Sequence, residues 1–352
     1  MKKIAFFIGS MNRGGAERVI SILSKSYAER GYKTDIVMLL SNEVGYELHP
    51  NTKVLDFTGN TSSRLKRLPY WIKSIRRYVK EEKPDVIVSF VARINVIVYL
   101  ATLGLKTRLI VSERNDPRYD GRSVVTDVAT KLIYPHVESV VFQTERARRY
   151  FKSVKNCVII PNPIQVTREA TEEKTGKIVT VGRLAPQKNQ KLLIFALSKV
   201  AAKHPDAHLE IYGEGVMRGE LTSYVSELGL NDRVFLKGNV TDVHDRISDA
   251  SVFCLSSDYE GLSNALLEAM MVGLPCLSTN CAGADECISD GKNGFLVDIG
   301  DGDSLATRLD TLLSDEQLRR SFAKKAKETS KQFTIDRVML EWDKLINGEN
   351  HD

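Results

Sequence analysis

The sequence predicts an α/β protein with two Rossmann-like, doubly wound domains in tandem. The prediction rests on the length of 352 residues, on short β-branched runs that alternate with longer segments of helical period, and on a proline-rich break after which this alternation restarts. A chain of this length exceeds what one hydrophobic core usually supports. Alternating strands and helices are typical of βαβ units with a mostly parallel sheet.

The first half of the chain contains apolar runs of strand length with helical segments between them. The expected strands are 4–9, 35–40, 54–57, 86–90, 108–112, 139–143 and 157–160. The expected helices are 16–30, 64–82, 94–103, 124–134 and 144–151. The first run is too short for the apolar core of a secretory signal, so we interpret it as a buried strand.

Pro161-Asn162-Pro163 interrupts this pattern, because proline fixes its own φ angle and biases the preceding residue away from the helical region. We place the domain boundary there, with a first domain at 1–163 and a second at 164–334. The alternation then restarts, and the expected strands of the second domain are 178–182, 209–212, 234–237, 252–255, 275–278 and 295–297.

Two helix starts are expected near the C-terminus. Ser314 and Gln317 have the spacing of a capping box, which predicts a helix that ends near 331. Asp301-Gly-Asp303 can mimic a metal-binding D-x-D motif, but it follows a strand and precedes a helix. We therefore interpret it as a turn with an N-cap, and we expect no metal site.

Composition indicates an ordinary soluble globular protein, with 42% hydrophobic and 27% charged residues and a net charge of +5. The five cysteines show no C-x-x-C pair and sit mostly in apolar surroundings, which favours reduced thiols in the cytosol over disulfides or a zinc site. No stretch has the length of a membrane span. We expect a cytoplasmic protein with no nucleic acid partner.

Charge is concentrated in the stretch 64–83, which has eight basic and two acidic residues among apolar and aromatic ones. One interpretation is an amphipathic helix with a solvated face. The other is docking on an anionic membrane surface, for which interfacial helices use this mixture of residues.

Glycine-rich loops follow the first strand of each domain. Gly14 and Gly15 precede a helix, where backbone N–H groups can approach an anion. The spacing is not G-x-G-x-x-G, which argues against a nicotinamide site, and a tight turn is the alternative. In the second domain, Gly182 is followed by Arg183 and Lys188, two cations that can hold a diphosphate from two sides. A solvated basic loop is the alternative there.

Two glutamates flank a predicted helix start in the second domain. Glu260 follows the expected strand 252–255, at the edge where open α/β sheets bind ligands, and Ser263 is the expected N-cap. Glu268 lies in an apolar helical stretch, where a carboxylate is costly unless it is hydrogen-bonded. Ribose hydroxyls would satisfy it. An ordinary surface glutamate is the alternative.

Glu260 and Glu268, separated by seven residues, resemble the E-x7-E motif of retaining glycosyltransferases of family 4, which have the GT-B fold. The resemblance covers nearly the whole chain and is greatest for bacterial enzymes that build capsule, exopolysaccharide or lipid-linked oligosaccharides, including N-acetylgalactosaminyl transferases. The other segments that fall in the family's order are Gly14-Gly15-Ala-Glu-Arg, Pro161-Asn162-Pro163, Gly182-Arg183 with Lys188, and Tyr212-Gly213-Glu214-Gly215.

This resemblance implies a metal-independent transfer of a sugar from a UDP-sugar, in a cleft between the two domains. The first domain, joined by the helix 335–352, would bind the acceptor, and the second domain would bind the donor. No cofactor is implied. Glu260 would contact the donor sugar, Glu268 the ribose, and Arg183 and Lys188 the diphosphate. The other donor contacts would be Gly15, Gly182, Gly213, Asn239, Val240, Gly261, Leu262 and Ser263.

One position departs from the family. Many members carry a histidine after the fifth strand, where this chain has Arg114. An arginine cannot act as a base at neutral pH, so we expect Arg114 to contact a sugar or an acceptor phosphate. The expected acceptor-binding residues are Gly14, Gly15, Glu113, Arg114 and Asn115.

Three alternative functions stay open. The chain can be a GT-B relative with different chemistry, such as a nucleotide-sugar epimerase or a phosphorylase. It can also be a nicotinamide oxidoreductase or a non-catalytic sugar-nucleotide-binding protein. Because pockets on one fold serve many chemistries, the fold leaves the sugar and the acceptor open.

Overall fold

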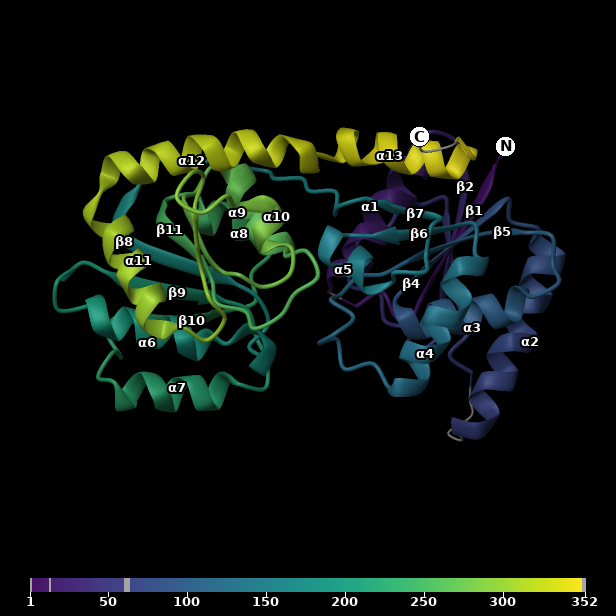
Figure 1. Ribbon diagram of the computed structural model, residues 1–352, viewed down its shortest axis with the longest axis horizontal. Coiled ribbons are helices and arrows are strands. Elements are labelled where there is room, and N and C mark those ends of the chain that lie inside the picture. The colour runs from purple at the N-terminus through teal and green to yellow at the C-terminus, as the bar shows by residue number, and fades with distance from the viewer. Residues whose placement is uncertain (1, 13, 60–63, 350–352) are drawn as a thin grey trace. The chain divides into compact units, whose positions relative to one another are not determined.

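The computed structural model describes residues 2–12, 14–59 and 64–349, and it divides into two compact α/β units (Figure 1). Unit 1 comprises residues 1–163 and 338–352, and unit 2 comprises residues 164–337. The C-terminal segment thus belongs to the first unit, although it follows the second in the chain.

Unit 1 is built on a parallel sheet with the strand order β3-β2-β1-β4-β5-β6-β7. Its strands are β1 (Lys3–Ile8), β2 (Lys33–Met38), β3 (Thr52–Asp56), β4 (Val86–Phe90), β5 (Arg108–Ser112), β6 (Ser139–Phe142) and β7 (Cys157–Ile159). Each predicted strand of the first domain is present, with ends within two residues of the expected ones. The strand order reverses between β1 and β4.

Helices cover the sheet of unit 1 on both faces. They are α1 (Gly15–Glu29), α2 (Arg64–Glu82), α3 (Ala92–Thr102), α4 (Val124–Ile133) and α5 (Glu145–Tyr150). Residues of α2 to α5 share one hydrophobic core with the sheet. The last helix, α13 (Ile335–Asn347), buries Trp342 against Phe90 of β4, with ring centroids 6.2 Å apart. Asp343 of α13 forms an ion pair with Arg30 at the end of α1.

Unit 2 repeats the plan with a six-stranded parallel sheet in the order β10-β9-β8-β11-β12-β13. Its strands are β8 (Lys174–Val181), β9 (His208–Tyr212), β10 (Val234–Gly238), β11 (Ala250–Leu255), β12 (Cys276–Thr279) and β13 (Phe295–Val297). Its helices are α6 (Gln190–Val200), α7 (Arg218–Glu227), α8 (Val243–Ile247), α9 (Asn264–Val272), α10 (Ala284–Cys287), α11 (Gly302–Ser314) and α12 (Glu316–Ser330). The strand order reverses between β8 and β11.

The predicted capping box is wrong. Ser314 is the last residue of α11, and Asp315 caps α12, because its carboxylate accepts a hydrogen bond from the Leu318 N–H at 2.8 Å. α11 continues through Ser314, the residue at which the sequence predicted a new helix to start. Asp315 alone separates α11 from α12. The interpretation of Asp301 is confirmed: its side chain caps α11 by accepting from the Ser304 N–H at 2.9 Å.

The cysteines are free thiols, as the sequence predicted, and all but Cys157 are buried. None of the helices in the described part of the chain combines the length and the hydropathy of a bilayer-spanning segment.

Candidate active site

The carboxyl ends of β8 and β11 mark the point in unit 2 where the strand order reverses. In open α/β sheets, ligands bind in the crevice outside the carboxyl ends of the strands at such a point. Residues 182–189 follow β8 and residues 256–263 follow β11. The two loops that carry Gly182, Lys188 and Glu260 are therefore neighbours, although they lie far apart in the sequence.

Lys188 and Glu260 form an ion pair across this point, with Nζ 2.5 Å from Oε1. The two side chains are only 16% and 9% exposed. Ser257 Oγ donates to the same carboxylate oxygen at 2.7 Å, and Gln187 Nε2 lies 3.5 Å from the other one. A cation and a carboxylate, both largely withdrawn from water, are thus held at the predicted ligand-binding edge.

Further hydrogen bonds connect the loop after β8 to the loop after β11. Asn189 adopts a left-handed conformation with φ 42°, which asparagine tolerates better than most residues. Its side chain donates to Asp258 at 2.8 Å, and the Asp258 N–H donates to the Gln187 carbonyl oxygen at 2.9 Å. Sequence analysis missed Gln187, Asn189 and Asp258, because their roles arise from contacts between segments about 70 positions apart. It also missed Ser257, which contacts Glu260 within the same loop.

Arg183 lies in the same loop, but its side chain is exposed. The described residues provide no ion-pair partner for its guanidinium. A second, exposed cation is therefore present in the loop that carries Lys188.

Glycines let the loops after β8 and β9 pack backbone against backbone. Gly213 has a φ of +141°, and a Cβ atom there would lie 2.0 Å from the Gly182 carbonyl oxygen. The Gly213 N–H donates to the carbonyl oxygen of Gly238, at the end of β10, at 2.8 Å. Asn239 and Val240, the predicted base contacts, directly follow. The predicted donor residues after β8, β9 and β10 therefore lie along one edge of the sheet.

The start of α9 brings the remaining predicted donor residues to this edge. Gly261, Leu262 and Ser263 connect Glu260 to the first turn of α9, where the helix dipole favours negative charge. Ser263 is the N-cap residue, as predicted, but its side chain makes no capping hydrogen bond. Glu268 lies within α9 and is 4% exposed, so it is not an ordinary surface glutamate.

In unit 1, Gly14 is the N-cap of α1 and Gly15 its first residue, at the carboxyl end of β1. The Gly14 carbonyl oxygen accepts a hydrogen bond from the Tyr46 hydroxyl at 2.9 Å. Nearby in the fold, Val91 follows β4 with a φ of 76°, which is strained for a β-branched residue. Both loops lie where the strand order of unit 1 reverses.

The predicted acceptor residues after β5 differ in their exposure to solvent. Arg114 is 6% exposed, its guanidinium lies 4.7 Å from the centroid of the Phe90 ring, and Nη1 donates to Asn162 Oδ1 at 3.2 Å. Burial lowers the pKa of Arg114 to about 9. Asn115 is exposed.

Glu113 points into unit 1 and is 1% exposed. Arg122 Nη2 lies 2.6 Å from its carboxylate, and the Tyr134 hydroxyl donates to it. Burial raises the pKa of Glu113, while Arg122 opposes that shift. The Glu113–Arg122 ion pair connects the two ends of the loop 113–122. Sequence analysis missed Arg122 and Tyr134, since neither stands in a recognisable motif.

The structure thus gathers the predicted donor residues other than Gly15 in unit 2, whereas Gly15 and the predicted acceptor residues lie in unit 1. The roles of these residues as ligand contacts stay predictions. In the described part of the chain, no group of three or more His, Cys, Asp or Glu side chains is arranged to hold a metal ion.

Two family models match the chain, one in each half. Residues 13–168 match the model described as Glycosyltransferase Family 4, and residues 163–329 match the model described as Glycosyl transferases group 1. The two matches meet at the boundary between unit 1 and unit 2.

Curated relatives from bacteria align over nearly the whole chain. A GalNAc-alpha-(1->4)-GalNAc-alpha-(1->3)-diNAcBac-PP-undecaprenol alpha-1,4-N-acetyl-D-galactosaminyltransferase of Campylobacter jejuni is 30% identical, with 98% of each chain covered. An N-acetylgalactosamine-N,N'-diacetylbacillosaminyl-diphospho-undecaprenol 4-alpha-N-acetylgalactosaminyltransferase of the same organism is 29% identical, covering 98% of this chain and 99% of the relative. The amylovoran biosynthesis glycosyltransferase AmsD of Erwinia amylovora is 27% identical, covering 99% and 100%.

Solved structures share the fold. Alr3699/HepE of Anabaena in complex with UDP and glucose has a TM-score of 0.84 at 20% identity, covering 99% of this chain and 100% of the other. Sucrose-phosphate synthase of Thermosynechococcus elongatus has a TM-score of 0.87 at 17% identity, covering 99% of both chains.

Proposed function

Because the chain belongs to the glycosyltransferases that combine a family 4 domain with a group 1 domain in the GT-B fold, we propose that it is a retaining enzyme that uses a UDP-sugar. The transferred sugar is a hexose or an N-acetylhexosamine. The acceptor is a saccharide or a lipid-linked saccharide in the biosynthesis of a bacterial surface polysaccharide or glycan. The observation that carries this proposal is the Lys188–Glu260 pair at the point where the strand order of unit 2 reverses.

The chemistry of the pair suits the departure of a nucleotide diphosphate. The bond between the anomeric carbon and the diphosphate oxygen breaks, the acceptor oxygen bonds to the anomeric carbon, and the departing diphosphate takes up the proton of the acceptor hydroxyl. As the first bond breaks, negative charge grows on the diphosphate. Lys188, Arg183 and the first turn of α9 stabilise that charge, which is electrostatic catalysis by groups already in place. Glu260 holds hydroxyls of the donor sugar. Because fixed cations supply this stabilisation, we propose that transfer needs no metal.

The known proteins support the choice of substrates. Both Campylobacter relatives are named as N-acetylgalactosaminyltransferases that act on glycans linked to diphospho-undecaprenol. The Anabaena structure holds UDP together with glucose. We therefore propose UDP for the nucleotide and a polyprenyl-diphosphate-linked saccharide for the acceptor.

Thermal unfolding with nucleotides tests the donor. A ligand present at 100 times its dissociation constant stabilises the folded state by about 2.7 kcal/mol, which raises the melting temperature of a unit of this size by about 5–10 °C. UDP is expected to give such a shift, while GDP, ADP and NAD give a smaller one. An equal shift with all four ligands, or none with UDP, would remove the proposed donor. Proton NMR of the product, made in the presence of EDTA, tests retention and metal independence.

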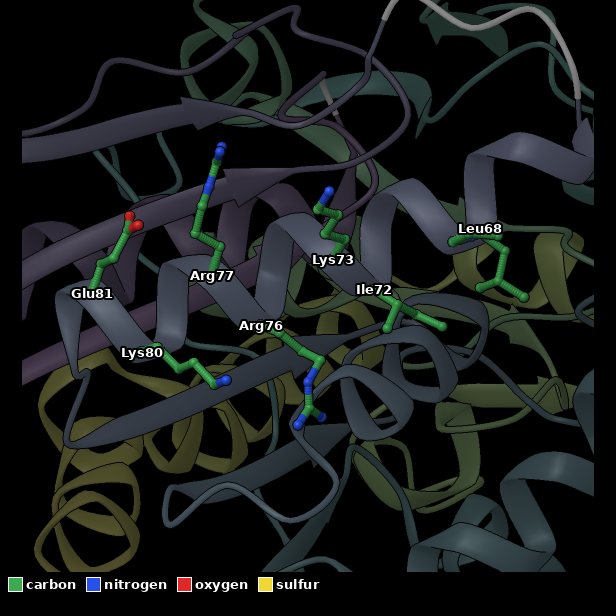
Figure 2. Close-up of a pocket in the computed structure, with 8 residues that line it drawn as sticks. Leu68, Ile72, Lys73, Arg76, Arg77, Lys80 and Glu81 are labelled. Carbon is green, nitrogen blue, oxygen red and sulfur yellow. The ribbon is translucent and has the colours of Figure 1, made fainter.

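We also propose that α2 contacts a membrane surface. The helix is amphipathic as predicted: Trp71, Ile75, Tyr78 and Val79 are buried in the core of unit 1. Figure 2 shows Lys73 and Arg77 pointing the same way, one helical turn apart. Together with Lys80 they are exposed, whereas Arg76 donates to the carbonyl oxygens of Ala101 and Leu103. The side chains of 64–66 lie outside the described residues.

α4 carries an exposed apolar ridge. Val124 and Val125 are 80% and 79% exposed, Leu132 is 66% exposed and Val128 is 50% exposed. The helix packs beside α3, which packs beside α2, so the three helices lie on the same side of the sheet of unit 1 (Figure 1). Exposed apolar side chains and exposed cations on one helical layer suit an anionic lipid surface. We propose that unit 1 docks there to reach a lipid-linked acceptor.

Flotation with lipid vesicles tests the docking. The protein is expected to float with vesicles that contain phosphatidylglycerol but not with pure phosphatidylcholine. Each cation near the surface contributes about 1 kcal/mol, so K73E/R77E/K80E should lower partitioning by about 100-fold or more. The control is K152E/K155E, which changes two other exposed lysines of unit 1. Indifference of the wild-type protein to lipid charge would contradict the docking.

A further inference from the structure

His244 is a buried histidine in unit 2 that no predicted role has used. It lies on α8, shortly after Asn239 and Val240, and is 7% exposed. Its Nδ1 atom lies 3.2 Å from the backbone N of Thr167 and 3.0 Å from the Thr167 hydroxyl. A backbone N–H can only donate, so Nδ1 must accept. The neutral ring therefore carries its proton on Nε2.

The protonated side of the ring faces the predicted ribose-binding carboxylate. His244 Nε2 lies 3.8 Å from Glu268 Oε2, and the two side chains are 9% and 5% exposed. Among the described residues, Nε2 has no hydrogen-bond partner. The separation exceeds a hydrogen bond, but a carboxylate shift of about 1 Å would bring Oε2 to bonding distance. A buried donor without an acceptor is unfavourable, which favours that shift.

We propose that His244 is a positioning residue for Glu268. When ribose hydroxyls bind the carboxylate, the Nε2–H of His244 donates to Oε2 and holds the side chain in its binding orientation. Because Nδ1 accepts from the Thr167 N–H, it is Nε2 that donates to Oε2, and Glu268 Oε1 remains an acceptor for hydroxyls. This inference rests on the proposed function, since it takes Glu268 to bind the ribose of UDP.

The two ring nitrogens can be tested separately, because amide side chains imitate each one. The side-chain nitrogen of His244→Gln can reach the place of Nε2 and donate to Glu268, whereas the shorter side chain of His244→Asn reaches only the place of Nδ1, where its oxygen can accept from Thr167. Calorimetric titration with UDP is expected to show binding about tenfold weaker in His244→Ala and His244→Asn, with most of the affinity restored in His244→Gln. In turnover assays, KM for the UDP-sugar should rise and kcat should change little.

A ligand without ribose hydroxyls separates positioning from mere packing. With 2′,3′-dideoxy-UDP, or in a Glu268→Gln background, the His244→Ala substitution should change affinity less than twofold. Ser248→Ala is the control, because Ser248 is equally buried at the end of α8 but donates to the Asp245 carbonyl oxygen. It should leave UDP binding unchanged.

Each outcome has a distinct meaning. If the wild-type protein binds UDP and His244→Ala binds it equally well, the inference is overturned and the proposed function stands. An equal loss of affinity for UDP and for the dideoxy analogue would show a structural role and would also overturn the inference. Failure of the wild-type protein to bind UDP would instead remove the proposed function.

Discussion

Replacement of Lys188 by alanine is expected to lower turnover by about 100- to 1,000-fold, the usual effect of removing one fixed group that stabilises transition-state charge. The physical reason is the position of the ammonium group. Its Nζ atom lies 2.5 Å from Glu260 at the ligand-binding edge, and the side chain is 16% exposed. A cation withdrawn from water interacts more strongly with a developing charge than a solvated one does.

The measurement is kcat for release of UDP from a UDP-sugar in the presence of a lipid-linked acceptor. Lys191→Ala is the matched control, because Lys191 lies three residues further along and forms an exposed ion pair with Glu220. It should retain full activity. The fold of Lys188→Ala should survive, since Ser257 still donates to Glu260. Near-normal turnover in both Lys188→Ala and Glu260→Ala would contradict the assigned site.

Replacement of Gly213 by alanine is expected to lower the free energy of unfolding of unit 2 by about 2–4 kcal/mol, from backbone strain and overpacking together. The φ angle of Gly213 is +141°, and the new Cβ atom would lie 2.0 Å from the Gly182 carbonyl oxygen. The Gly182 carbonyl oxygen belongs to the backbone, so it cannot move aside as easily as the end of a flexible side chain can. The loop after β8 would therefore have to move, and UDP binding should weaken with it.

Urea denaturation followed by circular dichroism measures the stability, and calorimetry measures the affinity for UDP. Gly219→Ala is the control, because Gly219 lies within α7 and an added Cβ atom there meets no atom within 4 Å. It should stabilise the protein by about 0.5–1 kcal/mol, since alanine suits a helix better than glycine does. Equal stability of Gly213→Ala and the wild-type protein would show that the two loops do not need this close approach.

The elements of the fold were largely predictable because their signals are local. The period of apolar residues over 64–82 predicted α2 with both its ends, and the strands of unit 1 lie within two residues of the expected ranges. The start of α12 was predicted wrongly. Serine and aspartate both cap helices well, and the choice between Ser314 and Asp315 depends on where α11 ends.

The exposed apolar side chains of α4 and the buried charged residues after β5 were not predicted, for a related reason. Valine is usually buried, yet Val124 of α4 is 80% exposed. Conversely, charged residues are usually exposed, yet Glu113 and Arg114 are both buried in unit 1. Side-chain exposure depends on which elements cover a segment, and residue type alone does not determine it.

By itself, the sequence determined the alternation of strands and helices, the break at Pro161-Asn162-Pro163 and the presence of Gly182, Lys188 and Glu260 in loops at strand ends. Each of these follows from residue preferences over a few neighbouring positions. Only the tertiary structure decided that β8 lies beside β11 and β9. That order pairs Lys188 with Glu260 across 72 positions and brings His244 to Glu268. Strand order is set by long-range packing of a whole sheet, which no local pattern encodes.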